Sequence, residues 1–341
     1  AERKEATVVF GPGIHEPVVV KLKSHDRVYI DKDAFVLGSF QADGVEDVKV
    51  CGYGIICGSR NRRVGDRCYR EGMDGAVRII DSKKIAFDGP TVLDSCCWCV
   101  AAFNSSDIEF AHIKVTGAWR YNTDGIDICN SQRVTIRDSF VHSFDDAIVL
   151  KGNYPKFDRK DPVEDIRVER CTCWCGWGRT LEIGLETFAP YYKNIVFEDC
   201  DLIHNNAAAL SVHLGGPALI EDITYRNIRI EYDASEEAGV LQRSRDQKVT
   251  CKAPHSANWL DVSNLKMFGP GSLYTALGYN SSDDPYGTFK RLTVENIAIT
   301  VDDGAMKPRC YIKAQPSSSF GEIKVANIRL NGEPWTDQCS K

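Results

Sequence analysis

The sequence predicts an all-β protein that forms a single right-handed parallel β-helix, a solenoid of about nine to ten coils. Two observations lead to this fold class. A short phrase recurs along the 341 residues, in which a polar pair precedes an aliphatic residue, one further residue and another apolar one. Within each phrase apolar and polar residues alternate with a period of two, which is typical of a strand with one buried face. Helical spacing does not extend over any useful length of the chain.

The aliphatic anchors of this phrase set the length of the repeat. Successive anchors lie 23 to 37 residues apart, except for one gap of 69 residues. Turn-forming Gly, Asn, Asp and Ser residues separate the phrases. This spacing suits one coil per repeat, with neighbouring strands about 4.8 Å apart, whereas a propeller blade needs a longer period and a leucine-rich repeat needs its own leucine pattern. The anchors are Val48, Ile85, Ile108, Val134, Ile166, Ile195, Ile223, Leu292 and Ile323.

The whole chain, residues 1–341, is expected to form one β-helix domain. The long gap between Ile223 and Leu292 is expected to hold a further coil with a long loop, over residues 233–290. No amphipathic helix is visible before Val8, although the first coil of a β-helix has an exposed sheet edge that needs a cover. Two alternatives remain open: an upstream domain has been removed, or residues 1–10 form the cover.

Composition and charge exclude several classes of partner. The net charge of −6 and the pI near 5.7 argue against a nucleic-acid partner, which favours a basic surface. No run of eighteen apolar residues is present, so neither a transmembrane helix nor a membrane partner is expected. The first residues, "AERKEATVVF", lack the apolar core of a signal peptide, so the chain is either processed or not exported. A monomer or a weak homo-oligomer is expected.

The chain has 14 cysteines, an even number that suits disulfides and favours a secreted or periplasmic location. Cys171, Cys173 and Cys175 alternate with other residues, so a strand would direct all three to one face. Two interpretations of these three stay open. They are small apolar residues of the core, or they are disulfide partners.

Three aspartates lie at matching ends of two strand-like runs. The run "TDGIDI" (123–128) aligns with "DDAIVL" (145–150) at an offset of 22 residues, so that their aliphatic positions stack in the core. The same alignment places Asp124 over Asp146, with Asp145 adjacent. Carboxylates so close together raise at least one pKa, which suits a general acid, while another stays ionised as a base. A polar turn ladder or a calcium site is the alternative, but a ladder does not need an adjacent pair of aspartates.

The motif "NTDGIDI", followed by "DDAIVLKG", resembles the signature of the family 28 glycoside hydrolases, the polygalacturonase group. It is also similar to family 49, the dextranase and isopullulanase group, which shares the pectate-lyase-like β-helix. The resemblance covers most of the chain and implies inverting hydrolysis of a glycosidic bond in a poly- or oligosaccharide. By motif position it implies Asp145 as the general acid, with Asp124 and Asp146 activating water. It implies neither a metal nor an organic cofactor.

Two departures from the polygalacturonase pattern concern the substrate. Where that family has Gly-His-Gly, this sequence places Arg179, whose guanidinium would hold Asp146 ionised. One coil further, Ser211 and His213 replace Arg-Ile-Lys. An anionic sugar would then face three carboxylates, and one uncompensated contact at about 4 Å costs roughly 4 kcal/mol at an effective dielectric of about 20. We therefore expect a neutral α-linked substrate of the dextran, glucan or galactan type, with pectin hydrolysis of the polygalacturonase kind as the alternative.

The residues expected to bind the sugar surround the aspartates. Aromatic rings would stack on sugar faces, the two glutamates on the solvent face would contact hydroxyls, and the lysine would also pair with the catalytic carboxylates. Packing, or simple solvation of a charge, is the alternative for each of them. The expected substrate-binding residues are Trp119, Tyr121, Asn122, Lys151, Trp177, Arg179, Glu182, Glu186 and His213.

Two other classes of function remain open. A polysaccharide lyase on the same fold would cleave by β-elimination and needs a basic residue near a uronate. A non-catalytic glycan-binding β-helix would gain little from crowded carboxylates. The three aspartates argue against both.

Overall fold

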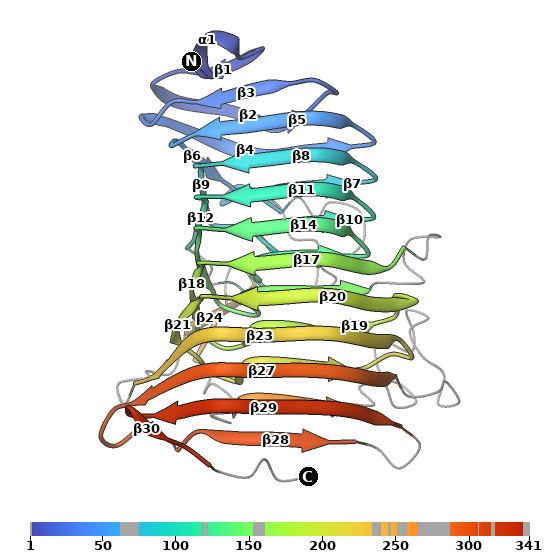
Figure 1. The fold of residues 1–341 in the computed structure, drawn as a ribbon. Coiled ribbons are helices and arrows are strands. Elements are labelled where there is room, and N and C mark those ends of the chain that lie inside the picture. The colour runs from blue at the N-terminus through green and yellow to red at the C-terminus, as the bar shows by residue number, and fades with distance from the viewer. Residues whose placement is uncertain are drawn as a thin grey trace.

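The computed structural model describes residues 2–61, 75–117, 120, 122–152, 161–233, 240–244, 247–250, 258–264, 287–305, 307–314 and 318–336. Apart from one helical turn, regular structure in these ranges consists of β-strands, and nearly all of them pair in parallel. Figure 1 shows the strands stacked as a column, from the blue N-terminal coils to the red C-terminal ones. The predicted right-handed parallel β-helix is confirmed.

The coil has three sides, each a stack of parallel strands. Face 1 is the side that carries the aspartates at the start of its strands. It consists of β4 (Ala34–Asp43), β7 (Val77–Ile80), β10 (Val100–Phe103), β13 (Ile126–Cys129), β16 (Ile148–Gly152), β19 (Arg179–Thr187), β22 (Ala208–Leu214), β26 (Asn258–Asn264) and β28 (Arg309–Lys313).

Face 2 contains the recurring phrase. It consists of β1 (Val8–Phe10), β3 (Arg27–Ile30), β5 (Glu46–Gly52), β8 (Lys83–Asp88), β11 (Ser106–Ala111), β14 (Gln132–Arg137), β17 (Val163–Glu169), β20 (Tyr191–Glu198), β23 (Leu219–Tyr232), β27 (Thr288–Val301) and β29 (Phe320–Leu330).

Face 3 is built mostly from short strands, and it uses the beginning of β4 and the end of β23 as well. Its other strands are β2 (Gly13–Lys21), β6 (Ile55–Cys57), β9 (Thr91–Leu93), β12 (Lys114–Thr116), β15 (Phe140–Ser143), β18 (Thr172–Cys175) and β21 (Asp201–His204). Two pairs of described strands are antiparallel: β24 (Val240–Ser244) with β25 (Gln247–Thr250), which form a separate sheet, and β30 (Glu333–Pro334) with the end of the face 2 strand β29.

The core runs through the inside of the coil. Inward-facing aliphatic residues of successive coils stack on one another, as the pairing of Ile126 with Ile148 and of Ile128 with Leu150 shows. Fully burying each such side chain contributes about 1.5–3 kcal/mol. The three alternating cysteines at 171, 173 and 175 are free thiols within this core, which agrees with their interpretation as small apolar residues.

Left-handed backbone turns explain the polar pair of the repeat. In seven coils, the residue before the anchor has a φ between 53° and 59°; these residues are Asp47, Lys84, Asp107, Arg133, Asp165, Asn194 and Asp222. Aspartate and asparagine tolerate this conformation better than other residues with a side chain. A second ladder follows the phrase, where the Nδ2 of Asn296 donates to the Oδ1 of Asn227 at 3.0 Å and the Nδ2 of Asn327 donates to the Oδ1 of Asn296 at 2.7 Å.

One helical turn, α1 (Glu2–Glu5), precedes β1 at the N-terminus. Arg3 ties this turn to the first coil, with its Nη1 3.0 Å from the Oδ2 of Asp31 and its guanidinium 6.0 Å from the ring centre of Tyr29. Four residues are too few to show an amphipathic period. No helix among the described residues has the length and hydropathy needed to span a membrane.

The long gap in the repeat contains a face 1 strand. Ile223 of β23 pairs directly with Leu292 of β27, so the two anchors that bracket the gap lie on neighbouring strands of face 2. Between them, β26 pairs with β22 on one side and β28 on the other. Parts of the predicted loop over 233–290 lie outside the described residues.

Candidate active site

The three predicted aspartates lie together at the start of two neighbouring face 1 strands. The pairing of β13 with β16 extends back to Asp124 and Asp146, because the N–H of Gly125 donates to the carbonyl of Asp146 at 2.8 Å. The N–H of Asp145 donates to the carbonyl of Thr123 at 3.3 Å. All three aspartates are buried, with exposed fractions of 2% to 7%. The stacking predicted from the alignment of the two runs is therefore present.

Lys151 lies among these carboxylates. It projects from β16 to the outside of the coil, where its Nζ is 2.7 Å from the Oδ2 of Asp124 and 2.8 Å from the Oδ1 of Asp127. The Oδ2 of Asp146 is 3.8 Å away. The ammonium also lies 4.1 Å from the ring centre of Trp98, within the range of a cation–π contact. The expected pairing of this lysine with the aspartates is seen for Asp124 and Asp146, and the structure adds Asp127 as a fourth carboxylate of the group.

Arg179 begins β19 and lies one coil beyond Asp146, as the alignment predicted. Its backbone N–H donates to the Oδ1 of Asp146 at 3.0 Å. Its guanidinium is farther away: Nη1 is 3.8 Å from the same oxygen and Nε is 3.9 Å from the Oε1 of Glu182. These separations are too long for direct hydrogen bonds, and the side chain keeps 27% of its surface exposed.

The two glutamates are not on a solvated face, so this expectation was wrong. Glu182 and Glu186 are 0% and 7% exposed. The alternation of residues along β19 correctly placed their side chains outside the core of the coil, but at β16, β19 and β22 the outside of the coil is itself buried. The pKa of Glu182 is lowered to about 2: burial raises it, but the charge of Arg179 and the hydrogen bond to His213 outweigh burial.

His213 connects Glu182 to a carboxylate on the next strand. Its Nδ1 is 2.8 Å from the Oε1 of Glu182, and its Nε2 is 3.2 Å from the Oδ1 of Asp261. The strand register agrees with this arrangement, because Glu182 pairs with Ser211 and Ser211 pairs with Asp261. Ser211 is fully buried.

Burial has the largest effect on the ionisation of the three aspartates. It raises the pKa of Asp145, and it raises those of Asp124 and Asp146 well above the ordinary range. The charge of Lys151 acts in the opposite direction on each of them. Repulsion between neighbouring carboxylates, which the sequence suggested as the cause, adds to burial but is smaller. Burial thus shifts each of these carboxyls towards its protonated form, which is the form that a general acid needs.

The aromatic residues expected near the site are placed only in part. Trp119 and Tyr121 lie outside the described residues. Asn122 is half-buried in a left-handed turn, with a φ of 58°, two residues before Asp124. Trp177 stacks on Phe144, the residue before Asp145, with ring centres 6.0 Å apart and planes inclined by 10°. This contact packs the Trp177 ring beside the aspartates.

Sequence reasoning missed three residues of the group: Trp98, Asp127 and Asp261. Asp127 had a usable signal, because it alternates with the core residues of "TDGIDI" and so projects outward beside Asp124. Asp261 lies in the long gap, where no anchor sets the register. Trp98 belongs to a second apolar cluster outside the coil, with Cys96, Cys97, Ala101, Phe103, Ile80 and Cys129.

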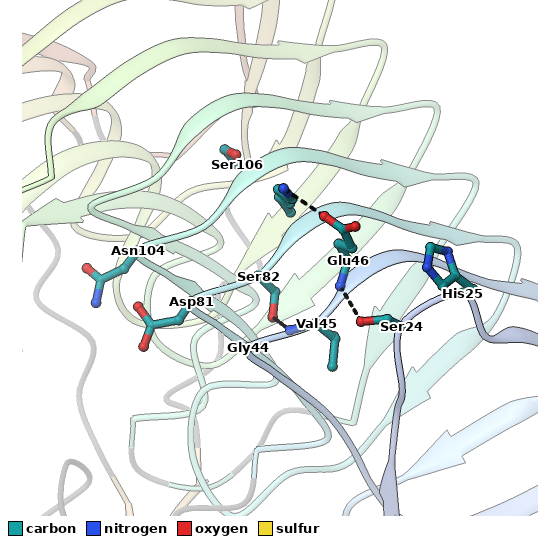
Figure 2. A pocket seen from close by; sticks show the side chains of 10 residues that line it. Ser24, His25, Gly44, Val45, Glu46, Asp81, Ser82, Asn104 and Ser106 are labelled. Carbon is teal, nitrogen blue, oxygen red and sulfur yellow. Dashed lines mark hydrogen bonds and ion pairs between the residues drawn. The ribbon is translucent and has the colours of Figure 1, made fainter.

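A separate cavity of about 580 Å³ lies on the turns between face 1 and face 2 of the N-terminal coils. Figure 2 shows its lining, in which Glu46 is held by the Nζ of Lys83 at 2.7 Å. The hydroxyl of Ser82 accepts from the N–H of Val45 at 3.1 Å. Its wall includes Asn104, which follows β10, so the cavity lies at the opposite ends of the face 1 strands from the aspartates. It contains none of the residues predicted for the site.

Comparison with known proteins agrees with the motif. The family model of the glycosyl hydrolases family 28 matches residues 4–304. A protein named probable exopolygalacturonase B from Aspergillus terreus is 25% identical over 259 residues, which cover 69% of this chain and 57% of that protein. An exopolygalacturonase from Rhizopus delemar is 29% identical over 112 residues, 32% of this chain and 27% of that protein. The chain thus spans about half the length, or less, of these curated relatives.

Solved structures show the same fold. The exopolygalacturonase of Thermotoga maritima superposes with a TM-score of 0.61 at 15% identity and covers 96% of this chain and 84% of that one. The polygalacturonase of Erwinia carotovora gives a TM-score of 0.58 at 14% identity, with 96% and 86% covered. Since the family model extends over most of the sequence, this chain belongs to the glycosyl hydrolases family 28.

Proposed function

We propose that the protein is an inverting glycoside hydrolase that cleaves α-linked galacturonate chains of the pectin type. The observation that carries this proposal is the buried group of Asp124, Asp145 and Asp146 at the start of β13 and β16, in a chain of family 28. The names of the curated relatives, exopolygalacturonases, favour pectin over the neutral glucan or galactan that we expected from the sequence.

In the proposed reaction Asp145 donates a proton to the oxygen of the leaving sugar. Asp124 and Asp146 accept a proton from the water that attacks the anomeric carbon from the opposite side, which inverts its configuration. Burial supports the acid, because it raises the pKa of Asp145. Lys151 supports the base, because its ammonium is 2.7 Å from Asp124 and opposes the rise that burial causes in the pKa of this carboxyl.

A neutral substrate was expected because Ser211 and His213 stand where the polygalacturonases have a basic pair for the sugar carboxylate. Arg179 meets this need in the proposed enzyme. Its guanidinium is partly exposed and lies 3.8 Å from Asp146 and 3.9 Å from Glu182, so its N–H groups are not committed to either carboxylate. Arginine binds carboxylates through paired, charge-assisted hydrogen bonds. We therefore assign the galacturonate carboxylate to Arg179.

A substrate screen tests this proposal. The release of reducing ends is measured on polygalacturonate, dextran and galactan, and the same reactions are followed in the ultraviolet. We expect the fastest release on polygalacturonate and no ultraviolet-absorbing unsaturated product. Faster cleavage of a neutral glycan would favour the hypothesis of a glucan or galactan substrate. An unsaturated product would show a lyase, and binding without any cleavage would show a glycan-binding solenoid.

Arg179→Gln and Arg179→Lys separate charge from geometry. We expect the glutamine variant to raise KM for polygalacturonate by tenfold or more, since a charged hydrogen bond contributes about 1.5–3 kcal/mol. The lysine variant keeps the charge but lacks the planar pair of donors, so we expect its KM to lie between those of the wild type and the glutamine variant. Unchanged KM in both variants would show that another residue holds the carboxylate.

A further inference from the structure

The donors of Lys151 are committed to the protein. An ammonium has three N–H groups, and two of them are accounted for by Asp124 and Asp127 at 2.7 and 2.8 Å. The ammonium nitrogen also lies 4.1 Å from the centre of the Trp98 ring and 3.8 Å from the Oδ2 of Asp146. The side chain is only 4% exposed. The structure therefore gives Lys151 no direct route to a sugar, in contrast to the substrate-binding role expected from the sequence.

Asp127 is placed to compete for the same ammonium. It is fully buried on β13, three residues after Asp124, and its Oδ1 accepts from Lys151. Among the described residues, its Oδ2 and the Oδ1 of Asp124 have no hydrogen-bond partner. Each aspartate thus uses one oxygen to hold the lysine. For Asp124, the contact with Lys151 fixes the orientation of the carboxylate through Oδ2.

We propose that Lys151 and Asp127 are a positioning pair that orients Asp124 and sets the pH above which it acts as a base. Lys151 favours the ionised form of Asp124, and Asp127 opposes it by sharing the ammonium and adding a negative charge. This inference rests on the proposed hydrolase function, but it concerns the ionisation of Asp124, which can be measured without turnover.

Other charged groups face Asp124 from the elements packed around it. Asp145 and Asp146 precede β16 and, like Asp127, raise the pKa of Asp124. On β19, Arg179 is a cation near Asp146, and Glu182 and Glu186 add negative charge nearby. These groups are the same in the variants used below, so differences between the variants report on the lysine and its partner.

Two substitutions with opposite expected signs test the pair. In Lys151→Met the base loses its cation, so the acidic limb of the profile of kcat/KM against pH should move up by about one unit or more. In Asp127→Asn a competing negative charge is removed, so the same limb should move down by about one unit. KM should change by less than about threefold in both, since neither side chain reaches the substrate. The proposal would be overturned if the acidic limbs of the two variants stayed at the wild-type pH or moved in the same direction. A tenfold higher KM at unchanged kcat in Lys151→Met would also overturn it.

Titration of the carboxyl groups by difference infrared spectroscopy gives the second readout. The band of Asp124, identified by its loss in Asp124→Asn, should titrate at higher pH in Lys151→Met and at lower pH in Asp127→Asn. This measurement stands even if no glycan is cleaved, which separates failure of this inference from failure of the proposed function. An Asp124 band that titrates identically in the wild type and Asp127→Asn would overturn it.

Two further variants control for folding and for charge. Lys83→Met removes an exposed lysine that pairs with Glu46 at 2.7 Å on the other side of the coil, and it should leave the pH profile unchanged. If Lys151→Met alone does not fold, the double variant Lys151→Met/Asp127→Asn removes one charge of each sign. Its acidic limb should lie above that of Asp127→Asn by about one unit or more. Coincident limbs for these two variants would contradict the role of Lys151.

Discussion

His213 and Glu182 form a buried contact, with the Nδ1 of the ring 2.8 Å from the Oε1 of the carboxylate. The other ring nitrogen is 3.2 Å from Asp261, so the imidazole joins carboxylates of two different strands. Burial lowers the pKa of His213, but the hydrogen bonds to Asp261 and Glu182 outweigh burial and raise it above its ordinary value. A protonated ring between two carboxylates has both N–H donors engaged, which leaves neither for the substrate contact expected of His213 from the sequence.

Removal of His213 should destabilise the fold. His213→Ala leaves Glu182 buried without its closest partner, and breaking a buried ion pair on one side costs about 3–5 kcal/mol. The free energy of unfolding from urea denaturation measures this loss. The matched variant His213→Leu/Glu182→Leu removes both charges and should recover most of it. A loss below about 1 kcal/mol in the alanine variant would show that the contact has little energetic weight.

Replacement of Asp145, the proposed general acid, should abolish most of the activity without unfolding the protein. Asp145→Asn removes the proton for the leaving sugar and should lower kcat by about 10²- to 10⁴-fold. Proton NMR of fresh wild-type product should show the inverted anomer. Asp107→Asn is the control, since this exposed aspartate pairs with Arg133 at 2.7 Å away from the site. A retained anomer would rule out the inverting mechanism even if Asp145 proved essential.

The stability of the protein should decrease as the pH rises through the acidic range. Burial raises the pKa of Asp127 from 3.8 to about 7, although Lys151 opposes it. Between these values the unfolded chain releases the proton and the folded chain retains it, so the free energy of unfolding falls by up to about 1.4 kcal/mol per pH unit for this group. Urea denaturation at pH 4.5, 5.2 and 6 measures the slope.

Asp127→Asn should flatten this dependence, because it removes a titrating group. Glu182 does not mask the effect: its folded pKa is lowered, so its contribution is present above 4.5 and is lost only as the pH falls towards about 2. A variant with the same slope as the wild type would show that Asp127 does not titrate in this range.

The asparagine ladder of the turns should respond to backbone conformation. Asn296 has a φ of 58° and bonds to Asn227 and Asn327 in the coils on either side. Asn296→Ala should cost about 1–2 kcal/mol of unfolding free energy from the left-handed backbone alone. Asn296→Gly loses the same side-chain bonds but adopts this conformation readily, so it should be the more stable of the two. Equal stabilities would show that the left-handed backbone carries no energetic cost at this position.

The sequence predicted the coil and the stacking of the aspartates because both depend on local alternation and on one constant offset. Once Ile126 is aligned with Ile148, the positions of Asp124 and Asp146 follow without further information. The burial of the Glu182 and Lys151 side chains cannot be predicted in this way. Alternation shows that a side chain leaves the core of the coil, but whether solvent or protein lies outside depends on segments far away in the chain. Trp98 against Lys151 is an example, since 53 residues separate them.

Because the coils are equally spaced, equivalent residues on successive strands beside the aspartates are separated by a constant distance. Glu182, Ser211 and Asp261 occupy equivalent positions on three successive strands of face 1, so each lies one strand spacing, about 4.8 Å, beyond the last. A coil inserted after β22 would move Asp261 by one such step and leave Asp124 and Asp146 where they are. Each coil added by evolution or design at this point would therefore shift the residues beyond it by one strand spacing, while the group of aspartates would keep its geometry.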